Sequence, residues 1–359
     1  MSPHAHGSTS KLESTTEARV SCNQPPPIIF GTSALGNLFQ ELDDQTKQGI
    51  VAQWFQSCGK QVAADSAGKY GAGLALESMA ASLKTLNIDP DQVLISNKLG
   101  WRRVPLKTPE PTFEPGAWVN LKYDAVQDIS YDGILRCYEQ GCELLDPYVP
   151  QWVSVHDPDE YLAAACSSKE REERMEDILG AYRALGELRE AGRVTAIGVG
   201  SKDWRVSQEI CEQCTLDWVM LATSLTIYTH SPEVLAFVEQ CHRDSIRVVN
   251  SAVFHSGFLT GGNHFDYREV VGNCESDRKL IHYREKFETV CRSHNVSPAQ
   301  ACVSFGMSPP GVDAIALNSS RASRVEENVS LVQTSLPDKF WSAMKDAGMI
   351  DSQYPYVAS

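Results

Sequence analysis

Residues 61–71, QVAADSAGKYG, contain the pattern that decides the fold of this chain. A short apolar run, Val62 to Ala64, ends at the carboxylate of Asp65, and glycines at 68, 71 and 73 then break the backbone ahead of a helical stretch. Short continuous apolar runs are typical of parallel strands that are buried on both faces. The segment therefore predicts one strand–turn–helix unit, in which a buried strand brings Asp65 and then Tyr70 into a glycine-rich turn.

The same unit recurs along the chain. Seven more apolar runs alternate with helical stretches, at 27–33, 93–100, 152–158, 194–200, 218–224, 246–254 and 312–318. Eight such units in about 300 residues match a closed (β/α)₈ barrel, the TIM barrel of the α/β class. A doubly wound Rossmann sheet requires GxGxxG after an early strand, whereas GVGSKD at 198–203 follows the fifth strand and lacks the third glycine.

The barrel is predicted as a single domain over residues 24–350, between an N-terminal tail (1–23) and a C-terminal tail (351–359). The N-terminal tail is polar, rich in Ser and Thr and without a signal-peptide apolar core, which predicts disorder. Two long inserts, 101–128 and 261–280, follow the third and seventh strands. Both leave the C-terminal ends of strands, where barrel enzymes carry their active-site loops.

Composition excludes several classes of partner. The 359 residues carry a net charge of −14 and no basic stripe, so nucleic acid and an anionic membrane are not expected as partners. No apolar run reaches the ~18 residues of a membrane span. The eleven scattered cysteines predict reduced thiols and a cytoplasmic protein, and the CxxC at 211–214 lacks the second pair of a structural zinc site. Nothing in the sequence indicates an oligomeric state.

The predicted ends of strands two, three and four carry complementary polar groups, Asp65 with Tyr70, Lys98 and His156. A phenol has a pKa near 10, and a nearby lysine cation favours its ionised form. We therefore expect Lys98 to lower the pKa of Tyr70, Asp65 to orient Lys98, and His156 to donate to a substrate oxygen. Such a group moves a proton on and off an oxygen while a cofactor exchanges a hydride at its carbon.

Two other interpretations of these residues stay open at this point. His156 and Asp157 could bind a metal, although no third ligand stands at a suitable spacing, so no metal is predicted. Lys98 could form a Schiff base, as in barrel aldolases. Neither interpretation accounts for Tyr70.

A nucleotide site is predicted after the eighth strand, in LNSSRASRVEENVSLV. Ser319 and Ser320 open a helix, and Arg321 and Arg324 lie in its first turns. Helix N-terminal amides and arginines together bind anions, and barrels often hold phosphate after their last strands. The alternative is a capped amphipathic helix with Arg–Glu pairs along its surface.

These motifs resemble the aldo-keto reductases, NAD(P)-dependent oxidoreductases with a (β/α)₈ barrel. DSAGKYG, SNKLG, VHDPD and SSRASRVEEN resemble the family's motifs along a match from about residue 27 to 335. The resemblance implies a catalytic tetrad and a cofactor site, which are Asp65, Tyr70, Lys98 and His156 for the first and Asn318, Ser319, Ser320, Arg324, Glu327 and Asn328 for the second.

Within that family, SVHDPDEYLAAA and FEPGAWVNLKYDAVQDIS are most similar to the branch of sugar 1-dehydrogenases, which act on L-fucose, L-galactose or D-threo-aldoses. The resemblance implies oxidation of the C1 hydroxyl of a free aldose to a lactone, with Tyr70 as base. Trp101 and Trp118 are predicted to stack on the sugar ring, with loop packing as the alternative. A general NADPH-dependent aldehyde or ketone reductase and a non-catalytic nucleotide-sensing subunit are the alternative functions.

The sequence also departs from the family pattern. The family's Ser-Asn pair after strand five is replaced by GVGSKDW, its Gln after strand six by Ala222 or Thr223, and its Tyr after strand seven by a residue near Ser251. Asn318 stands where members that prefer NADP often have Lys. The resemblance thus implies NAD or NADP as cofactor, with NAD favoured, and leaves the contacts to the nicotinamide carboxamide open.

Overall fold

The computed structural model describes residues 25–59 and 61–357. The predicted N-terminal tail (1–23) lies outside the described residues, as do the last two residues of the predicted C-terminal tail. The described part of that C-terminal segment packs on the barrel. The Tyr354 ring stacks on Phe305, with centroids 4.5 Å apart, and its hydroxyl lies 2.8 Å from that of Ser308.

Eight parallel strands close into a barrel, in the order β1-β12-β9-β8-β7-β6-β3-β2. The predicted (β/α)₈ fold is therefore confirmed. Each strand falls within, or within one residue of, the predicted range. The strands are β1 (Ile28–Gly31), β2 (Val62–Ala67), β3 (Val93–Leu99), β6 (Trp152–His156), β7 (Ala196–Ser201), β8 (Trp218–Ala222), β9 (Arg247–Ser251) and β12 (Val312–Asn318).

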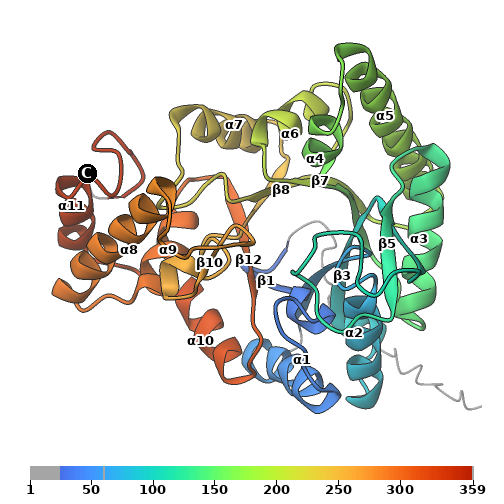
Figure 1. The fold of residues 1–359 in the computed structure, drawn as a ribbon, viewed down its shortest axis with the longest axis horizontal. Coiled ribbons are helices and arrows are strands. Elements are labelled where there is room, and N and C mark those ends of the chain that lie inside the picture. The colour runs from blue at the N-terminus through green and yellow to red at the C-terminus, as the bar shows by residue number, and fades with distance from the viewer. Residues whose placement is uncertain (1–24, 60, 358–359) are drawn as a thin grey trace, which may run out of the picture.

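Helices surround the barrel as an outer ring (Figure 1). Their starts follow the capping chemistry of the sequence: the Ser231 side chain accepts from the amide of Val234, and Ser297 forms a capping box with Gln300. The helices are α1 (Asp44–Cys58), α2 (Leu74–Thr85), α3 (Tyr131–Leu145), α4 (Pro158–Ala163), α5 (Ser168–Glu190), α6 (Trp204–Cys211), α7 (Pro232–Arg243), α8 (Glu275–Ser293), α9 (Pro298–Gly306), α10 (Ser323–Val332) and α11 (Asp338–Asp346).

The two ends of the barrel differ in chemistry. Near the N-terminal ends of the strands, Trp152 of β6 and Trp218 of β8 stack with ring centroids 5.5 Å apart, in a buried apolar cluster with side chains from the other strands. The C-terminal ends carry the buried polar side chains Asp65, Lys98 and His156. The N-terminal end of the barrel is thus closed by packed apolar side chains, and the C-terminal end carries the polar groups that could perform catalysis.

Both predicted inserts contain antiparallel hairpins that the sequence did not predict. In the first, β4 (Trp101–Pro105) pairs with β5 (Tyr123–Gln127), and in the second, β10 (His264–Phe265) pairs with β11 (Arg268–Glu269). Each hairpin follows the C-terminal end of a barrel strand, β3 or β9. The inserts therefore lie at the polar end of the barrel.

Two features of composition carry over to the structure. Among the described residues, no helix combines the length and the apolar character that a membrane span requires. The ten cysteines in the same ranges are free thiols, including both members of the CxxC pair.

Candidate active site

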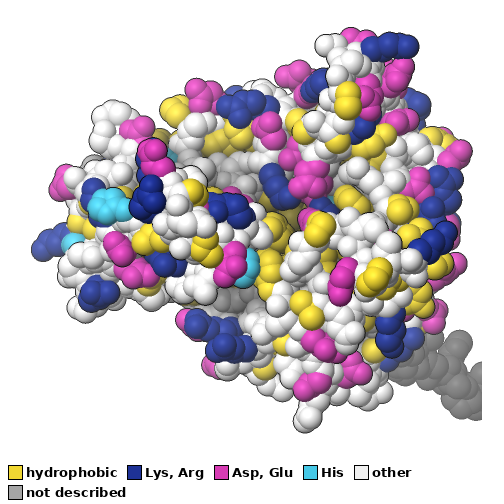
Figure 2. Space-filling view, viewed as in Figure 1, with side chains coloured by type: hydrophobic (Ala, Val, Ile, Leu, Met, Phe, Trp, Pro, Cys, Tyr) yellow, Lys and Arg dark blue, Asp and Glu magenta, His cyan; other side chains and the backbone are white. Residues whose placement is uncertain are grey.

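A cavity of about 730 Å³ opens at the C-terminal ends of the strands. It is visible as the hollow near the centre of the space-filling view, where charged side chains of both signs gather around an apolar floor (Figure 2). Its volume is in the range of pockets that enclose a ligand of drug or cofactor size. Asp65, Tyr70, Lys98 and His156 all line it.

The structure brings the four predicted catalytic side chains together. The Lys98 ammonium forms an ion pair with Asp65, and Ser96 of the same strand donates to the other carboxylate oxygen at 3.0 Å. Lys98 Nζ lies 4.7 Å from the centroid of the Tyr70 ring. The His156 ring stands edge-on to Tyr70, with centroids 5.6 Å apart. A phenol, a cation and an imidazole thus share one wall of the cavity.

Glycines bring the Tyr70 turn close to its neighbours. Gly71 has a φ of +62°, and a Cβ there would lie 2.4 Å from the carbonyl oxygen of Gly36. A Cβ on Gly68 would lie 2.4 Å from the carbonyl oxygen of Trp101. Only glycine fits both positions, because backbone from two other loops occupies the space of a side chain. The glycine-rich turn thus fixes Tyr70 between the loop after β1 and the first insert.

Burial dominates the electrostatics of the site. It raises the pKa of Tyr70 well above its ordinary value, and the carboxylates of Asp65 and Asp157 raise it further, while the Lys69 cation lowers it. The pKa of His156 falls well below its ordinary value, chiefly because burial penalises the imidazolium. Tyr70 is thus a protonated phenol and His156 a neutral imidazole at neutral pH.

This outcome differs from the expectation that Lys98 lowers the pKa of Tyr70. The Lys98 charge is balanced by its ion pair with Asp65, and the Asp65 carboxylate itself raises the pKa of the phenol. The cation that acts against the carboxylates is Lys69, which precedes Tyr70 in the chain. The sequence pattern alone did not single out Lys69.

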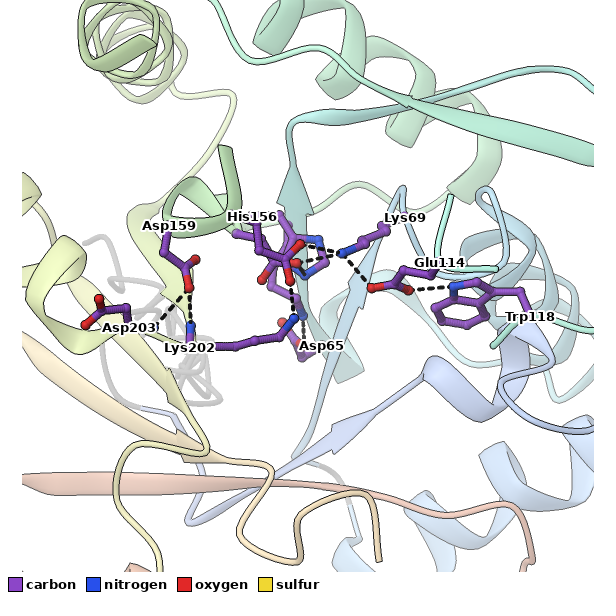
Figure 3. Close-up of polar contacts among 11 residues, drawn as sticks. Asp65, Lys69, Glu114, Trp118, His156, Asp159, Lys202 and Asp203 are labelled. Atoms are coloured by element: carbon purple, nitrogen blue, oxygen red, sulfur yellow. Dashed lines mark hydrogen bonds and ion pairs between the residues drawn. The ribbon is translucent and has the colours of Figure 1, made fainter. Parts of the chain in front are cut away.

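Lys69 is the centre of a buried ionic network (Figure 3). Its Nζ lies 2.8 Å from Asp157 Oδ2, 2.8 Å from Glu114 Oε1 and 3.2 Å from Glu160 Oε2. Lys202, after β7, forms a second ion pair with Glu160. Burial alone would lower the pKa of Lys69, but Asp157, Glu114 and Glu160 outweigh that effect and raise it. The network joins the Tyr70 turn to the first insert and to the ends of β6 and β7.

The predicted cofactor residues line the same cavity, from the end of β12 to the first turns of α10, and the helix begins at Ser323 and not at the predicted Ser319 and Ser320. These are Asn318, Ser319, Ser320, Arg324, Glu327 and Asn328, and Arg321 lies beside them. No side chain caps the N-terminus of α10, and the amides of Arg324 and Val325 donate to the backbone carbonyls of Arg321 and Ala322 at 3.1 and 3.0 Å. The helix dipole at this end favours an anion. Arg324 lies 2.9 Å from Glu327, so the alternative Arg–Glu pairing is also present.

These residues fit a nicotinamide dinucleotide. The cavity extends from Tyr70 to Arg324 without interruption, which allows one ligand to contact both the acid–base group and the anion site. The positions that depart from the family pattern, Ser201, Ala222 and Ser251, also line the cavity. The hydroxyl of Ser201 bonds to that of Ser207 at 2.7 Å, and that of Ser251 donates to the Leu221 carbonyl at 3.1 Å.

Neither Trp101 nor Trp118 is among the residues that line the cavity. Both pack around Phe113 inside the first insert, and Trp118 also lies against Tyr70, with ring centroids 5.8 Å apart. Trp118 Nε1 donates to Glu114 Oε2 at 2.7 Å. The contacts support the loop-packing alternative, and stacking on a sugar stays a prediction.

The two alternative chemistries gain no support from this geometry. Among the residues that the structure describes, no group of three or more metal-ligating side chains comes together. Lys98 forms an ion pair with Asp65 in the cavity, which is the arrangement expected of the tetrad.

Comparison with known proteins agrees with this geometry. Residues 27–348 match the model of the aldo/keto reductase family. Pyridoxal 4-dehydrogenase of Microbacterium luteolum is 25% identical over 336 residues, covering 89% of this chain and 93% of its own. D-threo-aldose 1-dehydrogenase of a Pseudomonas species is 25% identical over 334 residues, covering 90% and 94%.

Solved structures share the fold. Glycerol dehydrogenase of Gluconobacter oxydans superposes with a TM-score of 0.64 at 15% identity, covering 91% of this chain and 95% of its own. An aldo-keto reductase of Bacillus halodurans gives a TM-score of 0.59 at 16% identity, covering 89% and 91%.

Proposed function

Because this chain belongs to the aldo/keto reductase family and is an oxidoreductase of CH–OH or carbonyl groups, we propose that it oxidises the C1 hydroxyl of a free aldose to the lactone. The observation that carries the proposal is the position of Tyr70, which lies against Lys98 and His156 in a cavity that continues to Arg324. A bound nicotinamide nucleotide would supply the hydride acceptor.

Each residue of the tetrad has a role in this reaction. In its phenolate form, which is the minor form at neutral pH, Tyr70 takes the proton of the C1 hydroxyl when the hydride leaves C1. Neutral His156 donates a hydrogen bond to the substrate oxygen and orients it, which its lowered pKa permits. The Lys98–Asp65 pair holds a fixed cation against the Tyr70 ring.

Two observations support an aldose as substrate. The wall of the cavity near Tyr70 carries charged side chains, with Lys69, Glu114 and Lys202 among its lining residues, which suits a molecule with many hydroxyls. D-threo-aldose 1-dehydrogenase is also among the relatives, at 25% identity over 90% of the chain.

We propose NAD⁺ as the preferred cofactor, because a 2′-phosphate favours cations and one of the two arginines at the site, Arg324, is paired with a carboxylate. Arg324 forms an ion pair with Glu327 at 2.9 Å, and Asn318 supplies no charge. The free thiols of the described residues fit a reducing compartment, and we place the enzyme in the cytoplasm on that ground.

Cofactor reduction at 340 nm tests the proposal. We expect purified protein with NAD⁺ to respond to L-fucose, L-galactose or D-arabinose, and to respond less with NADP⁺. In the control, Tyr70→Phe abolishes the signal, while the affinity for cofactor, followed by titration of protein fluorescence, is unchanged. Silence on every aldose would exclude the proposal, and full activity of Tyr70→Phe would place the base elsewhere.

One observation favours a second function, reduction of aldehydes or ketones. A phenol with a raised pKa stays protonated at neutral pH and suits the general acid that carbonyl reduction requires. NADPH consumption on simple aldehydes without any response to aldoses would favour this reductase, whereas binding of cofactor without turnover would favour the nucleotide-sensing subunit.

A further inference from the structure

Glu114 places a carboxylate at the cavity wall, in a position that neither the predicted tetrad nor the predicted cofactor site includes. It belongs to the first insert, in the segment between β4 and β5, and lines the cavity together with Tyr70 and His156. Its side chain is 24% exposed, whereas that of its partner Lys69 is 3% exposed. The carboxylate is therefore accessible from the cavity while its support is buried.

The position of this carboxylate is fixed on two sides (Figure 3). Lys69 Nζ lies 2.8 Å from Oε1, and Trp118 Nε1 donates to Oε2 at 2.7 Å. Lys69 precedes Tyr70 in the chain, and the Trp118 ring packs against that of Tyr70 at 5.8 Å between centroids. Both supports of Glu114 are thus in direct contact with, or bonded to, the residue that handles the proton.

Glu114 still has acceptor capacity for a ligand. Each carboxylate oxygen accepts about two hydrogen bonds, and each oxygen of Glu114 has one donor among the described residues. The surrounding network has two cations, Lys69 and Lys202, against the carboxylates of Asp157, Glu160 and Glu114. The excess of one negative charge disfavours an anionic group here and favours hydrogen-bond donors.

We propose that Glu114 is a substrate-binding residue that accepts a hydrogen bond from a substrate hydroxyl close to the reacting carbon, and thereby selects hydroxylated substrates over plain aldehydes. The inference rests on the proposed function, because it names the substrate class of that same site. Lys69 and Trp118 are its positioning residues. A substrate hydroxyl can donate to the remaining acceptor sites of the carboxylate, whereas a plain aldehyde has no donor for them inside the cavity, which costs binding.

Two three-carbon aldehydes that differ only in their hydroxyls test this inference. The measurement is kcat/KM for reduction of glyceraldehyde and of propanal, in the wild type and in Glu114→Gln. We expect the variant to lose about 10- to 100-fold on glyceraldehyde, the loss typical of a hydrogen bond to a charged group, and to change less than about threefold on propanal. Glu110→Gln is the matched control, because Glu110 is exposed in the same insert and outside the cavity lining.

The outcomes separate this inference from the proposed function. If Glu114→Gln lowers kcat/KM equally for both aldehydes, Glu114 only shapes the loop. The inference is then wrong, even if the wild type oxidises aldoses. If the variant loses kcat/KM only for glyceraldehyde, and the wild type oxidises no aldose, the inference stands and the proposed oxidation fails. A wild type that turns over neither aldehyde and no aldose overturns both.

Discussion

Lys69 and Tyr70 are neighbours in the chain, and the Lys69 cation affects the pKa of the Tyr70 phenol. Burial and the carboxylates of Asp65 and Asp157 raise the pKa of the phenol, and Lys69 lowers it. Aldose oxidation needs the phenolate as base, so the charge on Lys69 assists that direction. Carbonyl reduction needs the protonated phenol, so the charge on Lys69 does not assist that direction.

Replacement of Lys69 by Met should move the pH profile of aldose oxidation to higher pH. Without the cation, the carboxylates act on Tyr70 unopposed, its pKa rises further, and less phenolate is present at any pH below that value. At neutral pH the phenolate fraction falls about tenfold for each unit by which the pKa of Tyr70 rises, and we expect kcat/KM to fall in proportion. The rate should recover as the pH is raised. The measurement is kcat/KM for an aldose from about pH 6 to 10.5.

Lys69→Arg is the control, because it keeps the positive charge beside Asp157 and should leave the profile where the wild type has it. Superimposable profiles for wild type and Lys69→Met would refute the assignment. A loss of rate that is equal at every pH would indicate displaced loops instead of a raised pKa of Tyr70.

The limits of prediction at this scale follow from where each residue sits. The convergence of Asp65, Lys98 and His156 was predictable because they lie toward the ends of adjacent strands, and the ends of parallel strands meet at one edge. The roles of Lys69 and Glu114 could not be predicted, because they depend on the ion pair that the two residues form in the folded protein. They are far apart in sequence, and each alone is an ordinary charged residue on a loop.

At the scale of elements, a buried carboxylate of α8 holds the second insert, in addition to the hydrogen bond that Arg284 of α8 donates to the carbonyl of Gly262 at 2.8 Å. Asp277, in the first turn of α8, accepts from Arg268 at 2.6 Å and from the amides of Val271 and Gly272 at 3.0 Å each. The same insert places Tyr267 in the cavity lining, with Lys202 Nζ 5.4 Å from its ring centroid. Asp277 thus anchors a loop that forms part of the cavity wall.

Asp277→Asn should loosen this insert at neutral pH. The hydrogen bond from Arg268, together with the two backbone amides, lowers the pKa of Asp277 to about 2. Its contribution is therefore complete above the unfolded pKa of about 3.9 and is lost only as the pH falls towards 2. We expect amides in 261–274 to exchange at least about tenfold faster in the variant, with little change in the barrel strands.

Hydrogen exchange with mass spectrometry measures this effect across about pH 6 to 8, where the difference between variant and wild type should be constant. Glu275→Gln is the control, because Glu275 lies in the same helical turn and pairs only with the exposed Lys279 among the described side chains. Equal exchange in Asp277→Asn and wild type would show that the insert is held by other contacts.

The location of both inserts was predictable from their length and from their place after the third and seventh predicted strands, but their hairpins were not. β10 and β11 are two residues each, and the five residues of β5 show no regular alternation of exposed and buried positions. Such short strands form because a partner strand and the rim of the barrel are present. Tertiary contact decides them, and local sequence does not.

At the scale of the whole molecule, the barrel separates stability from chemistry. The interior is filled near the N-terminal ends by the Trp152–Trp218 stack, and opens into the cavity at the other end. The eight-fold alternation of strands and helices was predictable, because continuous apolar runs reflect burial on both faces. The side chains that fill the barrel interior could not be predicted. Strands that are buried on both faces are apolar throughout, so no two-residue alternation shows which side chains point inward.

Trp218→Ala should lower the free energy of unfolding while leaving the active site in working order. Trp218 is 1% exposed, and its ring lies over Gly198, where a Cβ would come within 2.3 Å of the ring. The neighbouring backbone therefore follows the shape of the indole and cannot refill its space. Loss of a buried tryptophan costs about 3–5 kcal/mol, and a site that collapses poorly lies at the upper end.

The measurement is urea denaturation followed by far-UV circular dichroism, with kcat/KM determined on the folded variant. Trp204→Ala on α6 is the control, because that ring is only half-buried and stacks on Phe237 outside the barrel. We expect the control to lose clearly less stability, and both variants to keep kcat/KM within about threefold of the wild type, since neither ring touches the tetrad. A Trp218→Ala variant that is as stable as the control would mean that the stacked pair is not what closes this end of the barrel. A stable variant with strongly reduced kcat/KM would mean that the two ends are coupled, and the division between a packed end and a reactive end would then be wrong.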